Sequence, residues 1–215
     1  AKNMIYNSDE TIYVIAGEKG VTMGDGCRAN GTCSIAEGCY TEANGIGAHA
    51  EGQGSASYND SAHAEGYYTE AYGSNSHTEG ENTRADGQAS HAEGYDTTTY
   101  GDNSHAEGNS TNAVGNYSHA EGGTTNAHGW CSHTSGNYTL ANNNCEFACG
   151  RHNKSTSGDD YSSSATLFSV GFGTPPSESS RKNAIEITQT GVLKANQAWQ
   201  TGSDRKLKEN ITPLE

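Results

Sequence analysis

Small, polar and glycine residues alternate in one pattern that repeats every fourteen residues over residues 20–153, nine times without an insertion. We number each repeat from 0 to 13, so that the phrase S-H-A-E-G at residues 90–94 occupies positions 0 to 4. Position 4 is a glycine in every repeat from residue 24 to residue 150. Such strict spacing predicts a solenoid in which each repeat forms one coil stacked on its neighbours.

Positions 2 and 9 never carry a residue larger than Thr. Position 2 lies between polar residues at positions 1 and 3, which is typical of a β-strand with one face turned inward. We therefore predict a flattened coil of two short strands that enclose a very thin interior. The predicted interior alanines are Ala36, Ala50, Ala64, Ala92, Ala106 and Ala120 at position 2, and Ala43, Ala71, Ala85, Ala113 and Ala127 at position 9.

Two further positions predict the turns of each coil. Position 4 is always Gly, and position 11 is Gly except at Asn59 and Asn143. Because Asn tolerates the left-handed backbone conformation best after Gly, we expect both positions to be turns with a positive φ. Position 7 is a hydroxyl residue in eight coils, and we expect it to bond to turn backbone. The predicted turn glycines at position 4 are Gly38, Gly52, Gly66, Gly80, Gly94, Gly108, Gly122 and Gly136.

If position 2 points inward, positions 1 and 3 point outward, and they carry mainly His and Glu. In the end coils Val21, Ile35 and Phe147 replace the histidine, which indicates that this outer face is covered. A roll this thin buries too little to offset its chain entropy, so association of copies is expected. The predicted interface residues are His49, His63, His77, His91, His105, His119 and His133 at position 1, and Glu37, Glu51, Glu65, Glu79, Glu93, Glu107 and Glu121 at position 3.

The His and Glu residues suggest two kinds of chemistry. Our first hypothesis is a hydrogen-bonded ladder across subunit contacts, in which carboxylates raise the pKa of each His and imidazolium lowers that of each Glu. Assembly would then be most stable in mildly acidic to neutral solution. Metal binding is the alternative, since His and Glu are good ligands for Zn²⁺ or Ni²⁺. Because a regular ladder should satisfy its own polar groups first, we predict no metal and no cofactor. His128 and His152 lie outside this file and are expected at the surface.

Composition narrows the function classes. Only 31% of the 215 residues are hydrophobic and the net charge is −14, a balance that permits disorder, but the fixed period argues against it. Residues 20–150 hold sixteen acidic residues against Arg28 and Arg84, so nucleic acid is not an expected partner. No apolar run is long enough to predict membrane insertion. The six Cys have no metal or disulfide spacing and are expected to be free thiols. Every coil offers the same groups, so no catalytic set stands out and we predict that the chain is not an enzyme.

The segments outside the repeats have β-strand patterns of their own. Hydrophobic residues alternate at 167–172 and 184–187, and a tight turn at 189–191 leads into 192–193. We predict that residues 154–202 form a β-rich neck that clamps the assembly, and that residues 1–19 cap the opposite end.

The fourteen-residue phrase resembles the head repeat of trimeric autotransporter adhesins, the YadA-like head, whose pattern runs N-S-V-A-I-G. The matching phrases here are N-S-H-T-E-G at 75–80 and N-S-H-A-E-G at 103–108, with His and Glu in place of Val and Ile. The resemblance covers about residues 20–153. It implies an all-β fold, a left-handed parallel β-roll solenoid with 14-residue coils, and a homotrimer.

A second resemblance lies in T-G-S-D-R-K-L-K-E-N-I at 201–211, which looks like the opening of the intramolecular chaperone of phage tailspikes such as endosialidases. That family implies self-cleavage before Ser203, with Lys208 as its partner. Only residues 203–215 of such a domain are present, so we expect cleavage only in a full-length precursor. Together the resemblances predict a segment of a trimeric phage or prophage tail fibre that contacts the host surface. A bacterial surface adhesin head, which binds host matrix or glycan, is the alternative.

Overall fold

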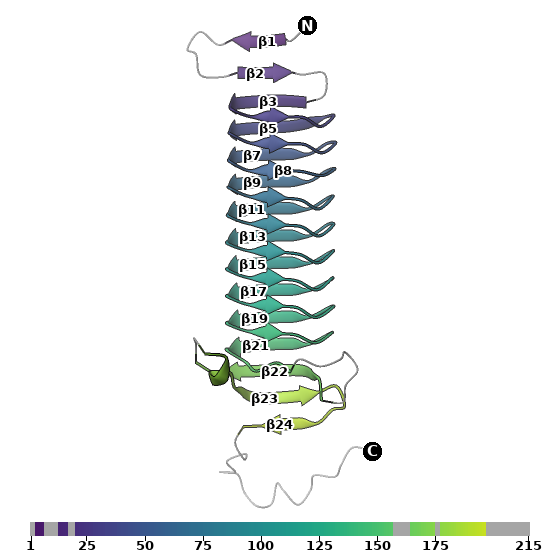
Figure 1. Cartoon of the computed structure of the whole chain (residues 1–215), viewed down its shortest axis with the longest axis vertical. Coiled ribbons are helices and arrows are strands. Elements are labelled where there is room, and N and C mark those ends of the chain that lie inside the picture. The colour runs from purple at the N-terminus through teal and green to yellow at the C-terminus, as the bar shows by residue number, and fades with distance from the viewer. Residues whose placement is uncertain (1–2, 7–12, 17–19, 157–163, 175–176, 197–215) are drawn as a thin grey trace, which may run out of the picture.

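The computed structural model of the chain describes residues 3–6, 13–16, 20–156, 164–174 and 177–196. The described residues form a straight rod of stacked β-coils with a small group of strands at each end (Figure 1). The only helical element among them is a short 3₁₀ turn, η1 (Glu178–Ser180). None of the described residues forms a helix with the length and hydrophobicity needed to cross a lipid bilayer. The chain is therefore an all-β parallel solenoid with coils of about fourteen residues.

One face of the rod is a sheet of fifteen strands, ten of which are the long strands of successive coils. These ten pair in parallel and in register, so that each residue lies beside its equivalent in the next coil, as His77 does beside His91. The long strands are β3 (Gly20–Asp25), β5 (Ser34–Cys39), β7 (His49–Gln53), β9 (His63–Tyr67), β11 (His77–Glu81), β13 (His91–Tyr95), β15 (His105–Asn109), β17 (His119–Gly123), β19 (His133–Asn137) and β21 (Phe147–Arg151).

The second face is a parallel sheet of nine two-residue strands, one for each turn of the solenoid. These strands are β4 (Arg28–Ala29), β6 (Glu42–Ala43), β8 (Ala56–Ser57), β10 (Glu70–Ala71), β12 (Arg84–Ala85), β14 (Thr98–Thr99), β16 (Asn112–Ala113), β18 (Asn126–Ala127) and β20 (Leu140–Ala141).

The space between the two sheets holds only small side chains. All eleven alanines that the sequence places inside are fully buried, and the hydroxyl residues at position 7 from Thr41 to Thr139 are buried with them. Among the described residues, no Leu, Ile or Phe is fully buried, and the bulkiest fully buried side chains are His, Glu, Asn and Thr. The solenoid therefore has a continuous but very shallow core.

The turns differ from the sequence prediction. The glycines at position 4, Gly38 to Gly136 among them, lie within the long strands, although their φ angles of 92° to 124° are positive as expected. The residues that turn the chain with a positive φ lie at positions 6 and 13, for example Asp96 and Asn103. Position 11 has no positive φ, even at Asn59 and Asn143. Glycine predominates there because a Cβ would meet the carbonyl oxygen of the next coil at 1.8 to 2.2 Å.

The hydroxyl file at position 7 bonds to backbone in one coil. Ser55 Oγ donates to the carbonyl of Gly66 in the next coil at 3.0 Å, and Cys27 Sγ makes the equivalent contact with Gly38 at 3.3 Å. The Thr hydroxyls of the other coils, such as that of Thr97, are buried without a hydrogen-bond partner among the described residues. All six cysteines are free.

Additional strands extend the long sheet at both ends (Figure 1). At the N-terminal end, β1 (Asn3–Tyr6) pairs antiparallel with β2 (Tyr13–Ala16), which pairs antiparallel with β3. At the other end, β22 (Thr166–Phe172) continues the parallel pairing from β21, and β23 (Asn183–Thr188) and β24 (Leu193–Ala195) follow antiparallel. These three strands and the turn at Gly191, whose φ is 79°, occur where the sequence pattern predicts them.

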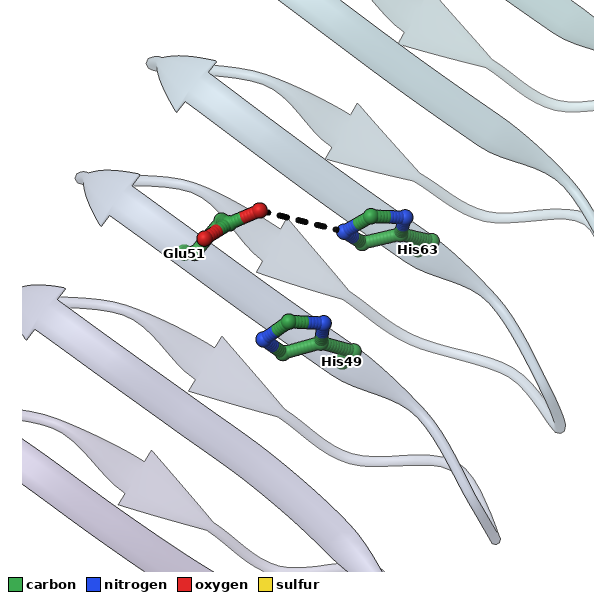
Figure 2. A group of neighbouring side chains, drawn as sticks. All are labelled: His49, Glu51 and His63. Carbon is green, nitrogen blue, oxygen red and sulfur yellow. Dashed lines mark ion pairs between the residues drawn. The ribbon is translucent and has the colours of Figure 1, made fainter.

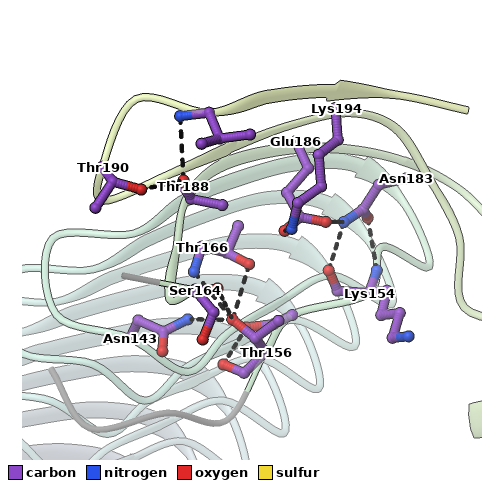
Figure 3. A network of polar contacts seen from close by, with 12 residues as sticks. Asn143, Lys154, Thr156, Ser164, Thr166, Asn183, Glu186, Thr188, Thr190 and Lys194 are labelled. Carbon is purple, nitrogen blue, oxygen red and sulfur yellow. Dashed lines mark hydrogen bonds and ion pairs between the residues drawn. The ribbon is translucent and has the colours of Figure 1, made fainter. Parts of the chain in front are cut away.

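Polar side chains replace the missing next coil at the C-terminal end of the short sheet. Asn153 accepts a hydrogen bond from Leu140 N at 2.7 Å and donates one to Leu140 O at 2.8 Å, as a neighbouring strand would. Thr156 Oγ1 contacts Asn143 Nδ2 and accepts from Thr166 N at 3.0 Å, while Asn183 brackets the backbone of Lys154 (Figure 3). The neck is therefore joined to the last coil by directed hydrogen bonds.

His152, which we expected at the surface, is only 1% exposed. Its Nε2 lies 2.9 Å from the carbonyl oxygen of Ser177 in the loop between β22 and β23. The expectation failed because that loop, which is distant in sequence, folds over the end of the last coil. His128 is exposed, as expected.

Candidate functional site

The outer face of the long sheet carries the two most regular files of chemically active side chains, and we call it the His–Glu face. It comprises the histidines at position 1 from His49 to His133 and the glutamates at position 3 from Glu37 to Glu121. Both positions point outward because the alanine or threonine at position 2 between them is fully buried. The parallel in-register pairing places every His beside a His and every Glu beside a Glu.

The imidazoles form a continuous stack along the rod. Neighbouring ring centroids from His49 to His133 lie 4.6 to 4.8 Å apart, with interplanar angles of 3° to 29°. About a third of each side chain is exposed, yet every Nε2 atom is buried and has no hydrogen-bond partner among the described residues. The stack thus presents seven polar atoms whose bonding is incomplete in one chain.

Phenyl rings extend this stack at its C-terminal end. Phe147 meets His133 edge to face at 4.8 Å, and Phe168 of the neck stacks parallel on Phe147 at 5.7 Å. At the other end, position 1 is Ile35, which is 38% exposed. Position 1 and its continuation into the neck therefore form one continuous row of side chains along the rod, which are aliphatic at one end, imidazole in the middle and phenyl at the other end.

Six of the seven imidazoles, all except that of His91, approach the glutamate of the preceding coil. His49 Nε2 lies 3.4 Å from Glu37 Oε1, and the equivalent distance from His63 to Glu51 is 3.5 Å (Figure 2). The other inter-coil pairs span 3.6 to 3.9 Å. Among the described residues, the Glu two positions later in the same coil comes within 4 Å only at His91, whose Nε2 lies 3.9 Å from Glu93. Within one chain these are contacts at ion-pair distance, and the hydrogen-bonded ladder across subunit contacts stays a prediction.

The carboxyl groups interact with one another more strongly than with the imidazoles. Hydrogen bonding with the neighbouring carboxyls of Glu51 and Glu79 raises the pKa of Glu65 to about 7, and Glu79 and Glu107 raise that of Glu93 in the same way. The pKa values of Glu51 and Glu79 are lowered by the same hydrogen bonds. From Glu51 to Glu93, a glutamate with a lowered pKa therefore alternates with one whose pKa is raised, because like charges one coil apart disfavour ionisation of both. The expected lowering of the Glu pKa by neighbouring histidines contributes at Glu51, Glu79 and Glu121, whereas the pKa values of Glu65 and Glu93 are raised instead.

Burial lowers the pKa of His63, His91, His105 and His133, and the neighbouring imidazoles lower it further at each of them. This is the reverse of the shift expected from adjacent carboxylates. The contribution of each of these four imidazoles to stability is therefore present above about pH 6.5 and is lost on acidification. The contributions of Glu65 and Glu93 are present below about pH 4.5 and are lost as pH rises through about 7. Near neutral pH these four imidazoles are thus uncharged, and Glu65 and Glu93 are only partly ionised.

An open groove of about 710 Å³ runs along this face beside Glu51, Glu65, Glu79, Glu93 and Glu107. Its floor is the file of position 4 glycines, which have no side chain to fill it. The groove gives a neighbouring molecule access to the carboxyl file along several coils.

Glu146 is a buried carboxyl that the sequence analysis missed. It occupies position 0, which is Ser or Ala in the eight coils before it, and that exception is the signal that could have revealed it. Its side chain is fully buried, and Oε2 accepts hydrogen bonds from Asn143 N, Asn143 Nδ2 and Ser155 Oγ at 2.8 to 3.0 Å. Burial raises its pKa to about 7 despite these donors. The junction of solenoid and neck therefore holds an acid that titrates near neutral pH.

Replacing this acid should change how stability depends on pH. Because the folded-state pKa is raised from 4.5 to about 7, the wild-type chain loses roughly 3 kcal/mol of stability as pH rises through that interval. The Glu146→Gln variant cannot ionise, so it should gain that amount relative to wild type between pH 5 and pH 9 in denaturant titrations. Glu81→Gln, at an exposed glutamate, controls for the loss of one charge. Equal differences from wild type at both pH values would contradict the assignment.

The aromatic residues at variable repeat positions do not form one patch. Tyr68, Tyr100, Tyr117 and Trp130 are each about half exposed, and of these Tyr117 and Trp130 are in edge-to-face contact at 5.9 Å. A separate small group stacks Tyr58 on Tyr72 at 4.3 Å, with Arg84 over the Tyr72 ring. These rings are available to a ligand at several places along the rod.

Two predicted features remain outside the site. Ser203 and Lys208, and the whole of residues 203–215, lie outside the described residues.

No protein-family model matches the chain, and no curated protein shows significant sequence similarity to it. The function of the chain must therefore be inferred from its fold, its sequence and the His–Glu face.

Proposed function

We propose that this chain is a non-enzymatic structural and adhesive segment of a trimeric phage or prophage tail fibre, in which three left-handed β-rolls bring their His–Glu faces together. The observation that carries the proposal is the half-buried imidazole stack, whose seven Nε2 atoms are buried and have no hydrogen-bond partner among the described residues. The face has aliphatic and phenyl groups at its ends, and sister chains would supply the hydrogen-bond partners that its imidazoles lack within one chain. The resemblance of the repeat to YadA-like heads supports three copies.

The shallow core supports association independently of that resemblance. Alanine, serine and threonine make up nearly all of the buried interior, and each contributes far less apolar area than a Leu or Phe. The entropy of ordering the backbone is about the same for each residue, whatever its side chain. Burying the long sheet against sister chains would add the apolar and aromatic contacts that the interior does not provide.

Attachment is the second part of the proposal. The half-exposed rings of Tyr68, Tyr100, Tyr117 and Trp130 are of the kind that stack on sugars or pack on protein receptors. If the His–Glu face is turned inward, the short-sheet side of each chain is left to contact a host surface. A trimeric assembly is common to a tail fibre and to an adhesin head. The sequence at 201–211 is the feature that favours the tail fibre.

Electron cryo-microscopy of the purified chain tests this arrangement. It should show three chains around one axis, with His91 and Glu93 of each chain turned towards that axis. A particle with the His–Glu face on its outside would contradict the proposed function.

A further inference from the structure

The His–Glu face contains four clusters in which three metal-binding atoms lie within 4.8 Å of one another. Three clusters consist of two histidines and one glutamate, and the fourth of two glutamates and one histidine. The clusters are His49/Glu51/His63, His63/Glu65/His77, His91/Glu93/His105 and Glu107/His119/Glu121. Two of them share His63, so three can be filled independently.

We propose that these clusters bind divalent transition-metal ions of the Zn²⁺ class, each held between a glutamate and the imidazole of the following coil, with a neighbouring side chain as third ligand. All three protein ligands come from one chain, so the site goes beyond the proposed trimer and does not require it. Water or a group from a sister chain would complete the coordination.

The glutamate–imidazole distance in the first cluster is close to the spacing that such an ion requires. Zn²⁺ binds imidazole nitrogen and carboxylate oxygen at about 2.0–2.1 Å, which places two ligands of a tetrahedron about 3.3 Å apart. Glu51 Oε1 and His63 Nε2 are 3.5 Å apart and face each other across adjacent coils (Figure 2). The ring of His49 is parallel to that of His63 at 4.7 Å, so it must rotate about its side-chain bonds to become the third ligand. The broad energy well of that torsion permits the rotation.

From the sequence we predicted no metal, because the His and Glu side chains were expected to satisfy one another's hydrogen bonds. The structure does not show those hydrogen bonds within one chain, over the residues that it describes. In the structure every Nε2 of the stack is buried and without a hydrogen-bond partner among the described residues. A buried polar atom without a partner is costly, and an ion bound to it would remove that cost.

The charge of the face also favours a cation. The glutamates form a file of like charges one coil apart, beside the imidazoles of the same strands. An ion between two coils would offset the repulsion between neighbouring carboxylates. Imidazole ligands select Zn²⁺, Co²⁺ or Ni²⁺ over Mg²⁺ and Ca²⁺.

Equilibrium dialysis of the chelator-treated full chain against Zn²⁺, followed by elemental analysis, tests the proposal. The chain should retain about three ions, and Mg²⁺ at the same concentration should not displace them. The variant His91→Gln/His105→Gln should retain about two, and so should Glu93→Gln, which keeps the size of the side chain. His128→Gln, at a histidine outside the face, should retain three.

Two results would overturn the proposal: no Zn²⁺ retained by the wild-type chain, or the same number retained by the wild-type, His91→Gln/His105→Gln and Glu93→Gln chains. Molar mass measured on the same samples separates this inference from the proposed function. A trimer without zinc would reject the metal sites alone, and a monomer that retains three ions would reject the trimer alone.

Discussion

Replacing Gly94 by alanine should prevent the chain from folding. Gly94 has a φ of 106°, and a Cβ there would lie 2.2 Å from the carbonyl oxygen of Gly108 in the next coil. Neither coil can move away, because parallel hydrogen bonds fix both within the long sheet. We expect a loss of at least about 4 kcal/mol, larger than most single substitutions cause. Circular dichroism should show that the strand signal of Gly94→Ala is lost or melts far below that of the wild type.

Gly47 provides the matched control. Its φ is also positive, at 65°, but the nearest atom to an added Cβ is Ser61 Oγ at 3.9 Å. The equivalent position 13 is Asn in two other coils, Asn75 and Asn103, with φ values of 59° and 54°. The Gly47→Asn variant should therefore melt within a few degrees of wild type. A Gly94→Ala chain that melts with the control would show that the coils are not packed as described.

Adding negative charge to the His–Glu face should abolish assembly. In His91→Glu/His105→Glu, carboxylates would replace two central imidazoles beside the existing Glu93 and Glu107. Carboxylates this close in a partly desolvated interface repel one another by several kcal/mol, which adds to the cost of burying the face. We expect the molar mass in solution to fall from three chains to one, with a lower melting temperature.

The same charge on the opposite sheet should have little effect. Thr98 and Asn112 occupy position 8 of the short sheet, where Glu42 and Glu70 occur in other coils. The variant Thr98→Glu/Asn112→Glu adds two negative charges on the face that we assign to the outside. Its mass should remain that of the wild type. A trimeric His91→Glu/His105→Glu chain with an unchanged melting temperature would show that the His–Glu face is not the contact.

The sequence was sufficient to predict which side chains face inward. The alternation of a small residue with His and Glu follows directly from strand geometry, and the coil period leaves the register no freedom. The role of glycine at position 11 could not be derived in the same way. Glycine is needed there because the backbones of two coils approach each other closely. In the sequence, a glycine required by such an approach looks the same as a glycine required by a turn.

The chemistry of the candidate site was less predictable than its location. A single-coil view pairs His63 with Glu65, whereas stacking places it beside Glu51 and between two other imidazoles. Burial and like neighbours then reverse the expected pKa shifts. His152 and Glu146 are buried by residues of the neck, and this tertiary contact has no counterpart in the repeat.

The molar mass of the intact chain in dilute neutral buffer tests the whole account most directly. Each chain has a mass of 22.5 kDa, so sedimentation equilibrium should give about 67 kDa over a wide range of protein concentration. A stably folded species of 22.5 kDa, with its imidazole stack open to water, would contradict it.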